Sequence, residues 1–212
     1  MATGTTAVTL ANQALDHLGT FAQIEDLSEA RPEARKMARW YPRARREVLS
    51  AHDWNFARRR LALASHSEDP PQHWGFRYQY PADCLVFRRI QHPLGPQADQ
   101  VPFEIEQAAD KTRSILTNLE QATGVFTRDE EDTGLFPPLV EALIARLLAA
   151  YTAYSLTKKL EVEKRQLELY NSEIKNVPVT LANEEAQAPP RDADWIRYRH
   201  AGLFDPTFLA GS

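Results

Sequence analysis

The hydrophobic period of the sequence changes within a short run between Trp40 and Phe56, and this change limits the folds open to the chain. Over the first part of the run, apolar side chains recur at helical spacing on one side, while Arg43 and Arg46 fall on the other. From residue 56 to 63 the pattern is that of a strand. The run therefore predicts a long helix that passes through a structural hinge, made by Trp54 and Phe56, into a β segment.

Further helical periodicity surrounds this β segment. A helix is expected over residues 5–18, and the long basic helix over residues 29–52, with Ser28 as a plausible N-cap and Pro42 as a kink. Two prolines at 137 and 138 precede a broad apolar face over residues 139–156, which predicts the central buried helix. A last helix follows residue 159 and has a narrow apolar stripe that fits one neighbour.

Short strand candidates, separated by proline and polar residues, fill the region between the second and third helices. They cover residues 56–63, 76–80, 84–91, 103–106, 114–116 and 125–127. The predicted fold class is mainly α with a β insert (α+β): a bundle of about four helices carrying a small antiparallel β-rich region, plus an extended C-terminal arm. In this organisation residues 1–54 and 136–186 form the bundle, 55–135 the insert and 187–212 the arm.

Charges are unevenly distributed, although the net charge is only −4. Residues 31–60 hold ten Lys/Arg against three acids, and residues 104–133 hold eight acids against three bases. Opposed patches suit association between subunits, because complementary potentials set their register. The candidate interface residues are Arg43, Arg46, Arg58, Arg60, Asp129, Glu130, Glu131 and Asp132. The alternative is that these charges pair within one fold or are solvated.

Motifs that would indicate an enzyme are missing from the sequence. The six histidines show no metal-ligand spacing, the single Cys84 has no cysteine partner, and glycine-rich phosphate loops and nucleophile elbows are absent. We expect no catalytic, cofactor or metal site, and a role for His52 at a helix end. The N-terminus lacks the features of a signal peptide, and no segment is expected to span a membrane.

Several landmarks occur in an order that resembles the head-to-tail adaptor (connector) family of tailed phages, of the tail tubular protein A type. They cover residues 10 to about 155 and comprise Ala11-Asn12 with Leu15 and Leu18-Gly19, Tyr41-Pro42 with Ala44-Arg45 and Val48-Leu49, Trp54-Asn55-Phe56-Ala57, the stretch from Tyr78 to Leu85, and Phe136-Pro137-Pro138.

The resemblance implies a structural virion protein of the neck or tail, assembled in the host cytoplasm, and not an enzyme. Such adaptors form a ring of their own copies, generally twelve-fold. The ring docks under the portal protein, connects it to the tail nozzle or next connector protein, and surrounds DNA that passes without sequence-specific binding. The tail carries none of these landmarks but is too apolar for an idle linker, so it should dock on its own subunit or on another chain. In the second case it is an arm in which Trp195, Tyr198, Phe204 and Phe208 contact the portal or an adjacent subunit. The alternative is a DNA-binding or regulatory protein that uses residues 31–60.

Overall fold

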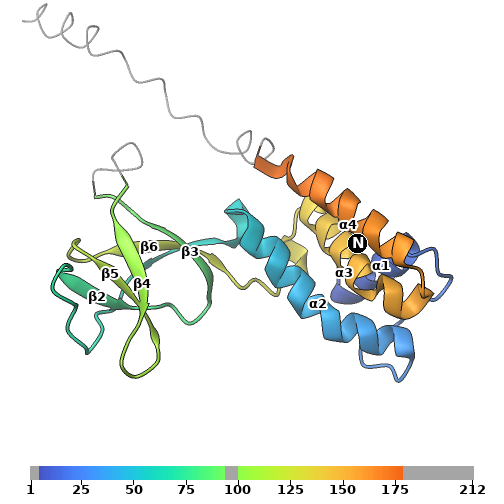
Figure 1. Ribbon diagram of the computed structural model, residues 1–212, viewed down its shortest axis with the longest axis horizontal. Coiled ribbons are helices and arrows are strands. Elements are labelled where there is room, and N and C mark those ends of the chain that lie inside the picture. Colours follow the sequence, from blue (N-terminus) through green and yellow to red (C-terminus); the bar gives the residue numbers. More distant parts are fainter. Residues whose placement is uncertain (1–4, 94–99, 179–212) are drawn as a thin grey trace, which may run out of the picture. The chain divides into compact units, whose positions relative to one another are not determined.

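The computed structural model describes residues 5–93 and 100–178 (Figure 1). Its helices are α1 (Ala7–His17), α2 (Pro32–Ala51), α3 (Pro138–Thr157) and α4 (Leu160–Ile174). Its strands are β1 (Arg58–Ala62), β2 (Phe76–Gln79), β3 (Cys84–Ile90), β4 (Phe103–Gln107), β5 (Arg113–Thr117) and β6 (Thr123–Arg128). Short 3-10 turns lie at Asn55–Ala57 and Thr133–Leu135. The predicted α+β class is confirmed, while the arm lies outside the described residues.

The central helix of the bundle is α3, which contacts α1, α2 and α4. Half of its residues are fully buried, because apolar side chains occupy most of its circumference. Its length and mean hydropathy of 1.4 are enough for a membrane span, contrary to the expectation from the sequence. However, 56% of its most apolar stretch is buried inside the protein. The core helix of a soluble protein commonly has the same length and hydropathy.

Helix α2 begins later than the sequence predicts. Its first residue is Pro32 and its N-cap is Arg31, so the predicted cap at Ser28 is wrong. Proline suits this place because its fixed φ is helical and the first helical N–H has no intrahelical partner anyway. The backbone N–H of Ser28 instead donates to the carboxylate of Asp26, within the loop before the helix. The helix then continues through Pro42.

The β insert consists of two antiparallel three-stranded sheets, ordered β1-β6-β3 and β2-β5-β4. Side chains from both sheets share one hydrophobic core, which includes Tyr78, Phe87, Ile115 and Phe126. In the central strand β6, a Cβ at Gly124 would lie 2.7 Å from the Phe87 ring. The missing side chain therefore lets that ring lie against the strand. The bundle has a separate hydrophobic core of its own.

Candidate functional site

The aromatic hinge, Trp54 and Phe56, packs the end of α2 against the segment just before α3. Trp54 is 2% exposed, and its indole N–H donates to the carbonyl oxygen of Val48 at 2.9 Å. The ring centroid of Phe56 lies 6.2 Å from that of Trp54 and 5.7 Å from that of Phe136, the residue that precedes α3 by two positions. Both hinge rings pack with the core of the helical bundle. The hinge thus fixes the point where the chain leaves the bundle.

Arg88 on β3 holds the C-terminal end of α2. Its Nη2 donates to the carbonyl oxygens of Ser50 at 2.9 Å and His52 at 2.6 Å, while its Nε donates to Thr127 Oγ1 at 2.9 Å. The last carbonyls of a helix lack intrahelical partners and carry partial negative charge, so a guanidinium is a favourable partner there. Burial lowers the pKa of Arg88, and the charge of Asp53 opposes that effect. Arg88 therefore ties the insert to the bundle.

Asp53 is a second link at this junction. Its carboxylate pairs with Arg58 Nε at 3.0 Å and with Arg89 Nη1 at 3.1 Å. Roles for Asp53, Arg88 and Arg89 were not apparent from the sequence. The sequence shows only two adjacent arginines in an expected strand and an acid just after an expected helix. This pattern does not indicate that the three side chains meet.

The acidic turn after β6 binds the arginines of α2 in the same chain. Asp129 accepts from Arg45 Nη2 and from Arg46 Nε, both at 2.7 Å, and Glu131 lies 3.1 Å from Arg45. The Arg45 side chain is only 5% exposed, so its charge needs these carboxylates. For Arg46 and Asp129 the structure thus shows pairing within one fold, the alternative that the sequence left open.

The other members of the predicted charge interface have different surroundings. Glu130 is buried, pairs with Arg128 and accepts the N–H groups of Glu131 and Asp132. Arg58 is held by Asp53 within the junction. An interface between subunits stays a prediction, and its exposed members are Arg43, Arg46, Arg60, Glu131 and Asp132.

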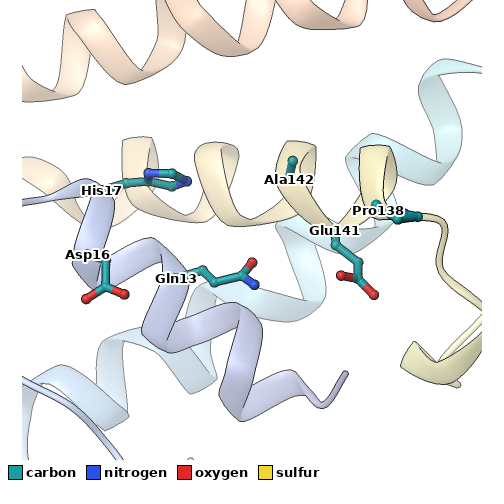
Figure 2. Close-up of a pocket in the computed structure, with 6 residues that line it drawn as sticks. All are labelled: Gln13, Asp16, His17, Pro138, Glu141 and Ala142. Atoms are coloured by element: carbon teal, nitrogen blue, oxygen red, sulfur yellow. The ribbon is translucent and has the colours of Figure 1, made fainter. Parts of the chain in front are cut away.

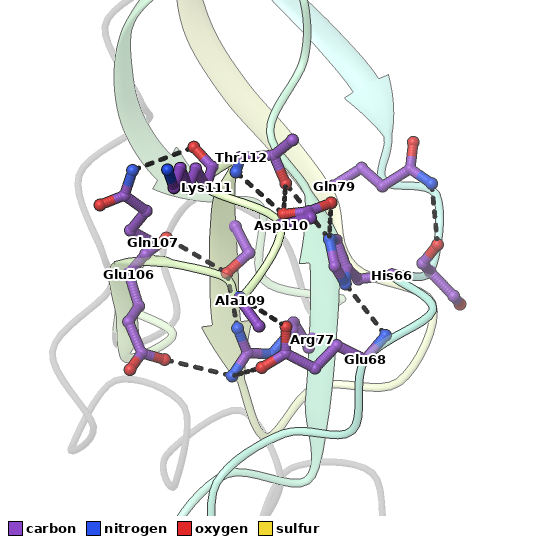
Figure 3. Close-up of polar contacts among 12 residues, drawn as sticks. His66, Glu68, Arg77, Gln79, Glu106, Gln107, Ala109, Asp110, Lys111 and Thr112 are labelled. Carbon is purple, nitrogen blue, oxygen red and sulfur yellow. Dashed lines mark hydrogen bonds and ion pairs between the residues drawn. The ribbon is translucent and has the colours of Figure 1, made fainter.

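A second polar cluster lies within the β insert (Figure 3). Arg77, whose side chain is 5% exposed, pairs with Glu68 at 3.4 Å and Glu106 at 3.2 Å. Glu68 also accepts the N–H of Ala109 at 2.8 Å. These contacts fasten the loop after β1 to the β4–β5 hairpin. The sequence did not indicate this cluster, because its members are up to 41 residues apart.

A shallow pocket of about 410 Å³ lies between α1 and α3 and is lined by Gln13, Asp16, His17, Pro138, Glu141 and Ala142. Figure 2 shows the carboxylates of Asp16 and Glu141 well apart. Burial, followed by the charge of Arg146, lowers the pKa of His17. Among the described residues there is no group of three or more His, Cys, Asp or Glu side chains suited to a metal ion.

Two of the remaining residues considered in the sequence have structural contacts, and four lie outside the described residues. His52 is the C-cap of α2, and its Nε2 lies 3.2 Å from the carbonyl oxygen of Ile174 at the end of α4. Cys84 is half-buried beside the core of the insert, and burial raises the pKa of its thiol. The four arm residues lie outside the described residues. They are Trp195, Tyr198, Phe204 and Phe208.

No family model and no curated protein matches the sequence. Among solved structures, one similar chain belongs to a structure described as "Neck of empty GTA particle computed with C6 symmetry". It is 19% identical, and the match covers 74% of this chain and 85% of that chain, with a TM-score of 0.25. A likeness at this level of identity and TM-score carries no argument about the function of this chain.

Proposed function

We propose that the protein is a head-to-tail adaptor of a tailed phage or prophage. In this role copies of the chain form a ring, twelve-fold in the expected case, between the portal protein and the tail nozzle or next connector. The protein is then a structural part of the virion neck, assembled in the host cytoplasm, and has no catalytic task. DNA passes through the ring without recognition of its sequence.

The observation that carries the proposal is where the landmarks of the resemblance lie in the fold. Asn12 exchanges two hydrogen bonds of 2.9 Å with the backbone of Ile24, which fixes the connection between α1 and α2. Trp54 binds the last turn of α2, and Phe136 is buried just before α3. The matching residues thus hold the joints between elements. Such positions define an architecture, and a structural role for the landmarks in this chain supports the proposal.

Several large apolar side chains are exposed on the described part of the chain. Phe21 is fully exposed, and Tyr154 and Leu160 are more than half exposed. Exposed apolar residues at separate places are ordinary, so these side chains are compatible with contacts to partners in an assembly. The buried arginine–carboxylate pairs at the junction contribute rigidity, which a ring subunit needs to keep its interfaces in register.

Assembly with the portal protein of the same phage or prophage tests the proposal. Native mass spectrometry and negative-stain imaging of the two purified proteins should give a complex that contains a closed ring of this chain. The portal protein of an unrelated phage is the control and should remain alone. Failure to join the cognate portal over a range of concentrations and salt would contradict the proposal. So would enzymatic turnover that a single substitution abolishes.

A further inference from the structure

The exposed side of α2 carries a row of arginines. Arg35, Arg39 and Arg43 are spaced four residues apart and are all exposed. At 3.6 residues per turn all three fall within about 80° around the helix axis. Successive members are about 6 Å apart along the axis. The buried side chains of α2, among them Met37, Ala44 and Val48, lie on the opposite side. We call Arg35, Arg39 and Arg43 the arginine row.

Ion pairs to the arginine row are missing from the part of the chain that the structure describes. Arg35 and Arg39 have no ion pair there. No ion pair joins either acid of α2 to the row: Glu33 lies 3.9 Å from Arg31, and Glu47, one turn after Arg43, accepts from the Tyr151 hydroxyl. Like charges four residues apart destabilise a helix, so the row works against the stability of α2. Its placement is understandable if an anionic partner covers it.

Arg43 is held in position at one end of the row. Its guanidinium carbon lies 5.5 Å from the ring centroid of Trp40 and 5.4 Å from that of Tyr151. Aromatic faces attract a guanidinium and restrict its motion. Because Arg43 is still exposed, this contact orients the cation and leaves it accessible to an anion. An arginine oriented in advance loses less entropy when it binds an anion.

The surface of the row fits phosphates better than a protein. Protein interfaces have apolar anchors at their centre, and none of the exposed large hydrophobic residues of the described chain belongs to α2. Guanidinium groups bind phosphate oxygens in bidentate fashion, and α2 has no Asn or Gln that would add contacts to base edges. We propose that the arginine row is a binding surface for the phosphate backbone of nucleic acid, independent of base sequence.

This surface should bind weakly in a single copy. The net charge of −4 opposes long-range attraction of a polyanion. Several copies that engage one duplex together would bind far more tightly, since each later contact is effectively intramolecular. The inference goes beyond the proposed function and does not depend on it, because phosphate binding can be measured on the free chain whether or not it joins a portal.

Salt-dependent binding of short duplex DNA by the full-length protein tests the inference. The variant Arg35→Gln/Arg39→Gln/Arg43→Gln removes three charges from the row and keeps good helix-forming residues. The matched control Lys164→Gln/Arg165→Gln/Lys175→Gln removes three exposed charges from α4 and its C-cap. Each lost phosphate contact lowers the slope of log K against log salt by about 0.9. We therefore expect the magnitude of this slope to be smaller by about 2–3 in the row variant. Its affinity for DNA at low salt should be at least about tenfold lower.

We expect the control to keep the salt slope of the wild type and the row variant to have a smaller slope. The wild-type protein should bind two duplexes of unrelated sequence with equal affinity. Circular dichroism checks that both variants remain folded. The inference is overturned if the wild type fails to bind DNA at low salt or if the two variants lose the same slope. It is also overturned if the row variant binds DNA normally but no longer joins the portal, since the row then contacts a protein. Portal joining is scored separately, so failure of the adaptor proposal remains distinguishable.

Discussion

At the level of single residues, Trp54 is the side chain whose loss should cost the bundle most. Trp54→Ala should lower the free energy of unfolding by about 3–5 kcal/mol, because a buried indole is replaced by a cavity. It also leaves the carbonyl oxygen of Val48 without its side-chain donor. Urea denaturation followed by circular dichroism measures the change, with equal m-values required for the comparison.

Trp54→Phe separates the two contributions. Phenylalanine keeps much of the ring but lacks the indole N–H, so this variant should lose clearly less than Trp54→Ala. Trp54→Ala with the wild-type denaturation midpoint would show that the hinge does not depend on this ring.

Asp110 supports the β4–β5 turn through its charge. Hydrogen bonds from the hydroxyl and the N–H of Thr112, at 2.6 and 2.9 Å, hold the pKa of its carboxyl below the ordinary value of 3.8. A lowered folded pKa means that the stabilisation is fully present above 3.8 and is lost as the pH falls through the folded pKa. Thr112→Val removes the hydroxyl, the larger cause, so the pKa should rise toward 3.8. Carboxyl NMR titration measures it.

Thr112→Ser is the matched control for Asp110, since serine keeps a hydroxyl at the same place. It should leave the pKa of Asp110 low. The explanation fails if the valine and serine variants titrate alike.

At the level of secondary-structure elements, sequence periodicity was sufficient for most of the fold. The expected strand over residues 84–91 is observed as β3 (Cys84–Ile90), and the helix expected over 139–156 is α3 (Pro138–Thr157). Both depend on local patterns of burial, which a sequence records directly. The junction could not be read in this way. Arg45 and Asp129 are 84 residues apart, and their pairing depends on where the β insert returns to the bundle.

The turn between α3 and α4 stores strain that a substitution can remove. Lys158 is the C-cap of α3 and has a left-handed φ of 59°, which costs a residue with a Cβ about 1–2 kcal/mol. Lys158→Gly relieves this cost, and the greater freedom of glycine in the unfolded chain offsets part of the gain. We expect a net stabilisation of about 0.5–1 kcal/mol, measured by urea denaturation.

The same substitution in regular helix provides the comparison. Lys164→Gly, at an exposed position inside α4, should destabilise the protein by about 1 kcal/mol. Opposite signs for the two glycine variants are the critical result. Equal destabilisation would mean that the left-handed conformation of Lys158 is not strained.

At the level of the whole molecule, the hydrophobic core of the bundle extends to Val177, close to the end of the described residues. Val177 is fully buried and belongs to the same hydrophobic cluster as the residues of α1, α2 and α3. The bundle therefore already has an extensive core within the described residues. Trp195, Tyr198, Phe204 and Phe208 follow it in sequence, so their contact with the portal or an adjacent subunit stays a prediction.

Deletion of residues 191–212 tests that prediction. Because the described residues up to Val177 already form an extensive core, we expect the free energy of unfolding to change by no more than about 0.5 kcal/mol. Joining to the portal should be abolished, and phage that carry the deletion should accumulate filled heads without tails. Replacing the four aromatic residues by alanine in the full-length chain should have the same effect, which separates the aromatic contacts from chain length. A truncated protein that unfolds would place the arm in the core of its own subunit, whereas normal assembly would show that the arm is dispensable.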